Sequence, residues 1–140
     1  MDYKKILSNF AVVLLIFFTD RLSKIYILNL AELDSKVDIY LTPFLNFYLI
    51  WNKGIAFGLL SLNDEIVYNF LTIIISIIIF IILIMLIRSR GFQRYSLLMV
   101  FGGSLGNLYD RIYFSAVPDF IDFHIGSFHW FIFNVADIFI

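Results

Sequence analysis

The chain has 140 residues, of which 61% are hydrophobic and 15% are charged, whereas soluble domains contain roughly 25% charged residues. This composition excludes an ordinary soluble domain and indicates a protein embedded in lipid. The net charge of -1 leaves no clustered basic surface for phosphate groups, so nucleic acid is not expected as a partner. Cysteine is absent, which excludes disulfides, thiolate metal ligands and cysteine nucleophiles.

Apolar runs predict four membrane helices, because crossing a bilayer core about 30 Å thick takes about 20 mostly apolar residues. The predicted helices are residues 6–28, 66–87, 95–114 and a segment that begins near Phe131. The run after Lys4 and Lys5 is similar to a secretory signal peptide, but no small-residue cleavage site follows it, which favours a retained helix. At about 1.5 Å per residue, the fourth helix crosses only about half of the core before Ile140. We therefore expect one membrane-embedded domain, residues 1–140, with a truncated last helix.

The distribution of basic residues predicts how the helices are oriented, since short cytoplasmic loops are rich in Lys and Arg. Basic residues flank the predicted helices in two clusters: Lys4 and Lys5, then Arg88, Arg90 and Arg94. Residues 115–130 contain neither Lys nor Arg. Both clusters and both termini are therefore predicted to face the cytoplasm, and residues 29–65 and 115–130 to lie on the outer side.

The first outer stretch is predicted to contain strands. Residues 37–41 and 45–51 are rich in aromatic and β-branched residues and are broken by Pro43 and Gly54. Such segments are typical of short strands. We expect a small outer-face sheet between the first two helices, and we interpret residues 115–130 as a loop.

Charged side chains at membrane depth are costly and are therefore candidates for function. The predicted topology brings a group of them to the outer membrane surface: Asp20, Arg21, Asp110, Arg111, Asp119, Asp122 and Asp137. Two close carboxyl groups can share one proton, so that one acts as a base and the other as an acid. Such a pair can hydrolyse a peptide without a metal or cofactor. The sequence contains no H-E-x-x-H zinc motif, no G-x-S-x-G elbow and no phosphate-binding loop.

Structural roles are open for several of these groups. Asp20 with Arg21 or Lys24, and Asp110 with Arg111, are candidates for ion pairs or capping groups at helix ends.

The residues around the last aspartates also have plain structural interpretations. Asp122 is expected to be solvated, and Asn134 is a candidate N-cap of the fourth helix. His124 and His129 lack metal-ligand neighbours at suitable spacing and are expected to be interfacial.

Five motifs occur in order along the chain: DRLSK at 20–24, NKGIAF at 52–57, GGSLGNLYDR at 102–111, VPDFID at 117–122 and FNVAD at 133–137. Together they resemble the signature blocks of lipoprotein signal peptidases (signal peptidase II). The resemblance implies an α-helical integral membrane protein of four transmembrane helices with a small outer-face β-cradle. It also implies an aspartyl endopeptidase without a cofactor, which removes the signal peptide from diacylglyceryl-modified prolipoproteins just before the lipidated cysteine.

The resemblance places the catalytic pair on Asp119 and Asp137. Residues that shape the site or hold the substrate fall on Asp20, Asn52, Asn107, Asp110, Arg111 and Asn134. Three positions depart from the usual family residues: Arg21 stands in place of Gln, Ile55 in place of Ala, and Pro118 in place of Val.

The resemblance further implies a place in the cell. It indicates the bacterial cytoplasmic (inner) membrane, with the active site near the periplasmic face, membrane lipids and the prolipoprotein as partners, and action as a monomer. Two other classes of function are open: a proton- or ion-coupled transport protein, and a non-catalytic subunit of a membrane assembly. Against transport, the acidic groups gather at one membrane face instead of crossing it.

Overall fold

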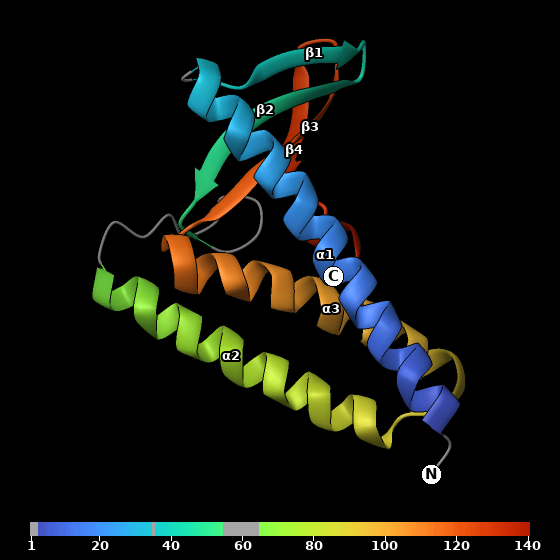
Figure 1. The fold of residues 1–140 in the computed structure, drawn as a ribbon. Coiled ribbons are helices and arrows are strands. Elements are labelled where there is room, and N and C mark those ends of the chain that lie inside the picture. The colour runs from blue at the N-terminus through green and yellow to red at the C-terminus, as the bar shows by residue number, and fades with distance from the viewer. Residues whose placement is uncertain (1–2, 35, 55–64) are drawn as a thin grey trace.

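The computed structural model describes residues 3–34, 36–54 and 65–140. Helices and strands follow in the order α1 (Tyr3–Asp34), β1 (Asp38–Thr42), β2 (Leu45–Asn52), α2 (Glu65–Arg88), α3 (Gly91–Phe114), β3 (Val117–Ile125), β4 (Phe128–Phe133) and the 3-10 helix η2 (Ala136–Ile138). Figure 1 shows the sheet standing at one end of the three long helices, opposite the N-terminus. The end of β2, the start of β3 and η2 all lie close to the helices.

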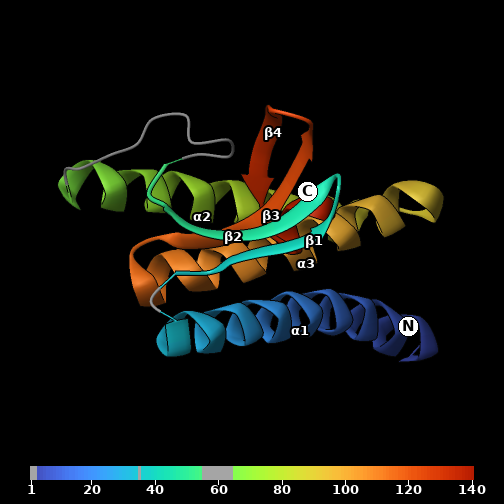
Figure 2. The same cartoon turned by 90° about the horizontal axis from the view of Figure 1, so that it is seen from above.

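Helices occupy the first three predicted segments, with longer bounds than the apolar runs alone indicate. Helix α3 lies between α1 and α2 (Figure 2). Small residues allow the close approach of α3 to α1: a Cβ atom added to Gly102 would lie 3.1 Å from the Ile16 Cβ atom. Residues 102–111 of α3 are thereby brought against the polar part of α1.

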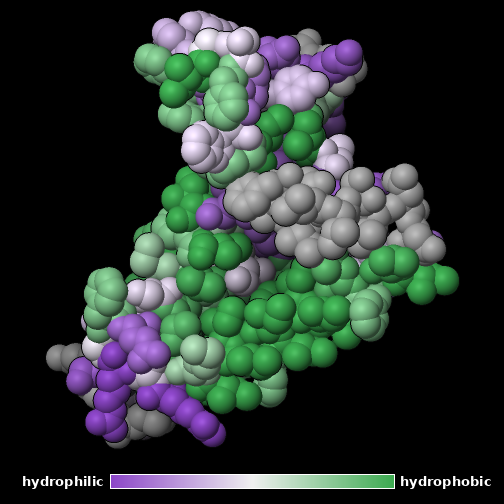
Figure 3. All heavy atoms as spheres, turned by 180° about the vertical axis from the view of Figure 1, so that it is seen from behind, coloured by the Kyte–Doolittle hydropathy of each residue, from purple (hydrophilic) through white to green (hydrophobic). Residues whose placement is uncertain are grey.

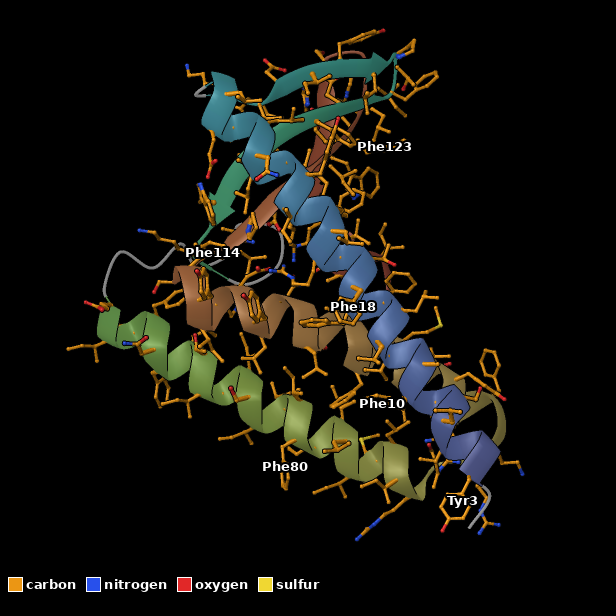
Figure 4. All side chains as sticks on the ribbon, in the orientation of Figure 1. Tyr3, Phe10, Phe18, Phe80, Phe114 and Phe123 are labelled. Atoms are coloured by element: carbon orange, nitrogen blue, oxygen red, sulfur yellow. The ribbon has the colours of Figure 1, made fainter. Side chains whose placement is uncertain are left out.

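The helices present a broad apolar surface. Among the described residues, α2 is the one helix long and apolar enough to cross a membrane by length and composition. Figure 3 shows hydrophobic residues over the helical part, and hydrophilic ones both at the end that carries the N-terminus and around the sheet. Phe80 on α2 points outward (Figure 4) and is 61% exposed. Apolar side chains exposed in this way are suited to contact with lipid tails.

The sheet is antiparallel, with strand order β1-β2-β3-β4. The strands predicted at residues 37–41 and 45–51 are confirmed as β1 and β2. The prediction of a loop at residues 115–130 is wrong, because β3 and the first half of β4 occupy that stretch. β3 has hydrogen-bonding partners on both sides: Asn52 of β2 pairs with Val117, and Phe133 of β4 pairs with Ile121. Pairing with β2 and β4 stabilises a strand where the sequence was interpreted as a loop.

The prediction of a fourth helix from about Phe131 is also wrong at its start. Phe131 belongs to β4, and residues 136–138 form the short helix η2. The aromatic and β-branched residues of β4 satisfy their backbone groups by pairing with β3. The motif position Ile55 lies outside the described residues.

A small apolar cluster anchors the sheet to the C-terminal part of α1. Ile27 of α1, Val37 before β1 and Phe120 of β3 are buried against one another. The Phe120 ring also makes an edge contact with Phe47 of β2, with ring centroids 5.8 Å apart. Burying side chains of this size stabilises the fold by about 1.5–3 kcal/mol each, and this cluster holds β3 in a defined position relative to α1.

Candidate active site

A cavity of about 180 Å³ lies where the helices meet the sheet. Its lining residues come from β2, α2, α3, β3 and the C-terminal segment: Asn52, Ile75, Ser104, Asn107, Arg111, Val117, Asp119, Asn134, Asp137 and Ile140. Both aspartates that the sequence indicates as catalytic therefore face one small space. A cavity with a few convergent polar groups and apolar walls is typical of a ligand-binding site.

Asp119 lies near the start of β3 and is 3% exposed. Each of its carboxylate oxygens accepts a hydrogen bond from an amide: the Asn134 Nδ2 donates to Oδ1 at 2.6 Å, and the Asn52 Nδ2 donates to Oδ2 at 2.9 Å. The two asparagines come from opposite sides, Asn52 from the end of β2 and Asn134 from the residue after β4. The carboxyl group is therefore held in one orientation at the cavity wall.

Burial raises the pKa of Asp119 from 3.8 to about 6. The hydrogen bonds from Asn134 and Asn52 act in the opposite direction, because they stabilise the charged form. The negative charge of Asp137 raises the pKa further, and Lys24 lowers it. The electrostatic effect of Asp137 on Asp119 is the behaviour expected of two carboxyl groups that share one site.

Asp137 is held by a second set of donors. The Asn107 Nδ2 donates to its Oδ1 at 2.8 Å, and the backbone N–H of Asn134 donates to its Oδ2 at 3.1 Å. The Asn134 Oδ1 in turn accepts a hydrogen bond from the Asp137 backbone N–H at 3.3 Å, but the N-cap of η2 is Val135, so the prediction of Asn134 as the N-cap is wrong. Asn134 thus contacts both aspartates, through its side-chain amide and through its backbone.

Arg111 supplies positive charge to the same cavity. Its guanidinium donates to the backbone carbonyl of Asn107 at 3.2 Å and to that of Gly54 at 3.5 Å. Because an Arg side chain stays protonated, one positive charge faces the two carboxyl groups. A pair that carries one proton and one negative charge would leave this part of the site electrically balanced.

A buried ion-pair network lies behind the cavity. The Lys24 Nζ, which is fully buried, donates to Asp110 Oδ2 at 2.6 Å, to Asp20 Oδ2 at 2.9 Å and to Asn107 Oδ1 at 2.9 Å. The Arg21 guanidinium is 2.6 Å from Asp110 and 3.1 Å from Asp20. Asp110 is therefore paired with Lys24 and Arg21 rather than with its neighbour Arg111, and two positive charges balance two negative ones.

The network also positions the segment that carries Asp137. The Asp20 Oδ1 accepts a hydrogen bond from the Ala136 backbone N–H at 3.0 Å. Gly103 and Gly106 of α3 leave room for this segment and for Asp20: an added Cβ atom would lie 2.5 Å from the Ala136 carbonyl oxygen and from the Asp20 Oδ2, respectively. Asp20 and Asp110 therefore do not line the cavity. They support it through Ala136 and through the Lys24 contact to Asn107.

Sequence reasoning missed the role of Lys24, which it treated as a candidate ion-pair partner of Asp20. The spacing of four residues places Lys24 and Asp20 on one face of α1, and that pairing is confirmed. The contacts to Asn107 and Asp110 could not be predicted, since those residues lie more than 80 positions further along the chain.

Two of the three departures from the usual family residues fall on described residues. Arg21 joins the ion-pair network and lies over the Tyr109 ring, 4.8 Å from its centroid, where a cation is attracted by the aromatic face. Pro118 is buried in β3 opposite Trp51 of β2. Both residues are accommodated by their surroundings, and the aspartates keep their hydrogen bonds.

The expectation that Asp122 is solvated is wrong. Asp122 is 3% exposed, and its carboxylate lies 2.8 Å from the His129 Nδ1. His124 is buried beside it, so the interpretation of His124 as interfacial is wrong, whereas the His129 side chain is 55% exposed. The two histidines also have a possible co-ligand in Asp122, contrary to the expectation. This group lies along the β3–β4 hairpin and does not line the cavity.

Comparison with known proteins agrees with this arrangement. A family model described as "Signal peptidase (SPase) II" matches residues 12–140. A lipoprotein signal peptidase of Pelagibacter ubique (strain HTCC1062) is 53% identical over 100% of this chain and 84% of that protein. One of Aquifex aeolicus (strain VF5) is 41% identical over 87% of this chain and 72% of that protein.

A solved structure described as "Bacterial membrane enzyme structure by the in meso method at 1.9 A resolution" resembles the fold with a TM-score of 0.73 and 27% identity, over 94% of this chain and 84% of that one. A second solved structure of a bacterial membrane enzyme gives a TM-score of 0.68 and 28% identity, over 94% of this chain and 79% of that one. These findings favour the peptidase over the transport and assembly alternatives. The chain belongs to the signal peptidase II family, the lipoprotein signal peptidases, which are aspartic-type proteases.

Proposed function

We propose that Asp119 and Asp137 are the catalytic pair with which this enzyme removes signal peptides from prolipoproteins. The single observation that carries the proposal is that the two carboxyl groups line one cavity and are held by a shared partner, Asn134. The activity of the family supports the reaction. The cavity supports the place that we assign to it.

The pair would act by general acid and base catalysis. One ionised carboxylate takes a proton from a water molecule, whose oxygen attacks the carbonyl carbon of the scissile peptide bond. The other carboxyl group delivers its proton to the reacting peptide, and the C–N bond breaks as the amine is protonated. The raised pKa of Asp119 supports its role as the group that holds the proton, since burial favours its neutral form.

The polar side chains around the pair are suited to binding a peptide backbone. Asn52, Asn107 and Arg111 line the cavity, and a peptide that leaves water must have its N–H and C=O groups hydrogen-bonded. Ile75 and Val117 supply apolar walls. The substrate would be a diacylglyceryl-modified prolipoprotein, cut just before the lipidated cysteine, with Asp20 and Asp110 holding the site in shape from behind.

The distribution of charge over the fold supports a proposed membrane arrangement. Lys5, Arg90 and Arg94 line one hollow at the end opposite the sheet, and basic residues favour the cytoplasmic side. We place α1, α2 and α3 across the bacterial inner membrane, with the N-terminus in the cytoplasm and η2 as the first turn of a fourth crossing. The sheet and the cavity then lie at the periplasmic face. Lipids cover the apolar surface, and the enzyme acts as a monomer.

Substitution of the two aspartates tests the proposal. Asp119→Asn and Asp137→Asn should each abolish cleavage of a purified diacylglyceryl-modified precursor, because Asn cannot transfer the proton, and each such role contributes about 10² to 10⁴ in rate. The double variant should lose no more than the single ones, since the pair acts as a unit. Asp38→Asn, the same change on the exposed strand β1, should cleave normally.

Substrate binding is measured separately, so that a binding defect is not mistaken for a catalytic one. The assignment would be overturned if Asp137→Asn cleaved at nearly the wild-type rate while Asp110→Asn or Asp20→Asn bound the precursor without cleaving it.

A further inference from the structure

We propose that Asp122, His124 and His129 form a binding site for a divalent transition metal ion, with zinc as the ion that fits the ligands best. The site lies on the β3–β4 hairpin, apart from the cavity that holds Asp119 and Asp137. Two imidazoles and a carboxylate are ligands that zinc accepts, usually with water in the fourth position of an open site.

The strand geometry explains how the three side chains meet. Asp122 and His124 are two residues apart on β3, so their side chains lie on the same face of the sheet. His129 of β4 is the register partner of His124, and the pairing is irregular between Asp122 and His124. The two imidazole rings stack with centroids 5.0 Å apart. Strand pairing therefore brings both histidines beside one carboxylate.

The distances agree with a metal site that needs only small side-chain adjustments on binding. Zinc bonds of about 2.0–2.1 Å in a tetrahedron place neighbouring ligand atoms about 3.3 Å apart. The Asp122 Oδ2 lies 2.8 Å from the His129 Nδ1 and 3.8 Å from the His124 Nδ1, on either side of that value. All three ligand atoms lie within 4.8 Å of one another. Side-chain adjustments of about an ångström would satisfy the metal geometry.

An unpartnered nitrogen is the second observation that indicates a ligand. His124 is 7% exposed, and its Nδ1 has no hydrogen-bond partner. Buried polar atoms almost always have a partner, and this one faces the Asp122 carboxylate from 3.8 Å, too far for a hydrogen bond. A bound metal would supply the missing interaction. The His129 side chain is 55% exposed, which leaves a path for the ion and for a water ligand.

A metal bound here would link the two strands of the hairpin. The His124 backbone N–H already donates to the Phe44 carbonyl at 3.0 Å. This hydrogen bond joins β3 at His124 to the turn between β1 and β2. Asp119 lies three residues before Asp122 on β3. The metal would thus restrain the strand that carries Asp119 without taking part in the hydrolysis.

Zinc titration of the full, untagged chain labelled with ¹⁵N-histidine in detergent tests the site. The chain has two histidines and no cysteine, so its imidazole spectrum contains the two candidate ligands and nothing else. We expect Zn²⁺ to bind with one-to-one stoichiometry and to shift the signals of His124 and His129 together. His124→Asn, His129→Asn and Asp122→Asn should each weaken binding at least tenfold, and Asp38→Asn should leave the affinity unchanged.

The melting temperature of each variant without zinc separates misfolding from the loss of a ligand. Zinc should raise the melting temperature of the wild-type chain. Each folded ligand variant should lose this rise as well as the affinity for zinc. Asp119→Asn should bind zinc as the wild type does, so failure of the catalytic assignment would leave this result unaffected. The proposal is overturned if zinc shifts only the exposed His129 signal, or if His124→Asn and Asp122→Asn bind zinc with wild-type affinity.

Discussion

The Lys24 ammonium and the Asn107 side-chain oxygen lie 2.9 Å apart in the protein interior. Because this oxygen accepts from Lys24, the Asn107 amide nitrogen must point the other way, where it donates to Asp137 at 2.8 Å. A cation on α1 therefore determines how an amide on α3 presents itself to a proposed catalytic carboxylate. Lys24 is a positioning residue, since it does not line the cavity itself and acts through Asn107, which does.

Replacing Lys24 by Met should reduce both stability and turnover. Asp20 and Asp110 would lose a buried cation, and breaking a buried ion pair costs about 3–5 kcal/mol. The freed Asn107 amide could also flip, and a misplaced catalytic group can reduce the rate about 10²-fold. Melting temperature and the turnover number for a lipidated precursor measure the two effects. Lys36→Met, a change at an exposed residue, is the matched control.

A double variant distinguishes positioning from simple destabilisation. Lys24→Met combined with Asp110→Asn removes one charge of each sign and should recover part of the melting temperature. Turnover should stay low, because the Asn107 oxygen still lacks its donor. Full recovery of turnover together with stability would show that Lys24 acts only on the fold.

Gly103→Ala should impair cleavage far more than Gly102→Ala. The new Cβ atom at position 103 would lie 2.5 Å from the backbone carbonyl oxygen of Ala136, so the segment that carries Asp137 must move. At position 102 the nearest atom is the Ile16 Cβ at 3.1 Å, a milder conflict that a shift of α1 by a few tenths of an ångström would relieve. We expect a loss in turnover of about 10²-fold for the first variant and little change for the second. Equal turnover in the two would contradict this account.

The raised pKa of Asp119 makes stability depend on pH. Between pH 3.8 and about 6 the folded carboxyl group keeps its proton while the unfolded one has lost it, so folding loses stability as the pH rises through this window. Two pKa units correspond to a penalty on the order of 3 kcal/mol. Asp119→Asn cannot ionise, so its melting temperature relative to the wild type should rise from pH 4 to pH 6 and then level off. A difference independent of pH would show that Asp119 is not protonated by burial.

Cysteine labelling tests the proposed orientation in the membrane. The natural chain has no cysteine, so single changes Gln93→Cys and Ser127→Cys introduce the only thiols, both at exposed positions. A membrane-impermeant thiol reagent applied to intact spheroplasts should modify position 127 and leave position 93 unmodified. After lysis both should react. Modification of position 93 from outside would mean that the fold lies in the membrane the other way round.

Features that depend on neighbours in sequence could be predicted from the chain alone. A long apolar run satisfies its backbone hydrogen bonds within the same segment when it becomes helical. All three long helices were predicted on that basis. The strands β1 and β2 followed from aromatic and β-branched residues between turn signals. The ordered motifs indicated the family and brought Asp119 and Asp137 together as a pair, although no local rule places them in one cavity.

Features that depend on distant partners were decided by the tertiary structure. β3 forms because it pairs with β2, and β4 forms because it pairs with β3. These strands replace the predicted loop and the start of the predicted fourth helix. Asp122 is buried because the hairpin brings His129 beside it. Lys24 reaches Asn107 only because glycines let α3 approach α1. The β2–β3 pairing and the Lys24–Asn107 contact join residues far apart in the chain, and the Asp122–His129 contact needs a hairpin between two strands. No periodicity or composition within one segment can indicate such contacts.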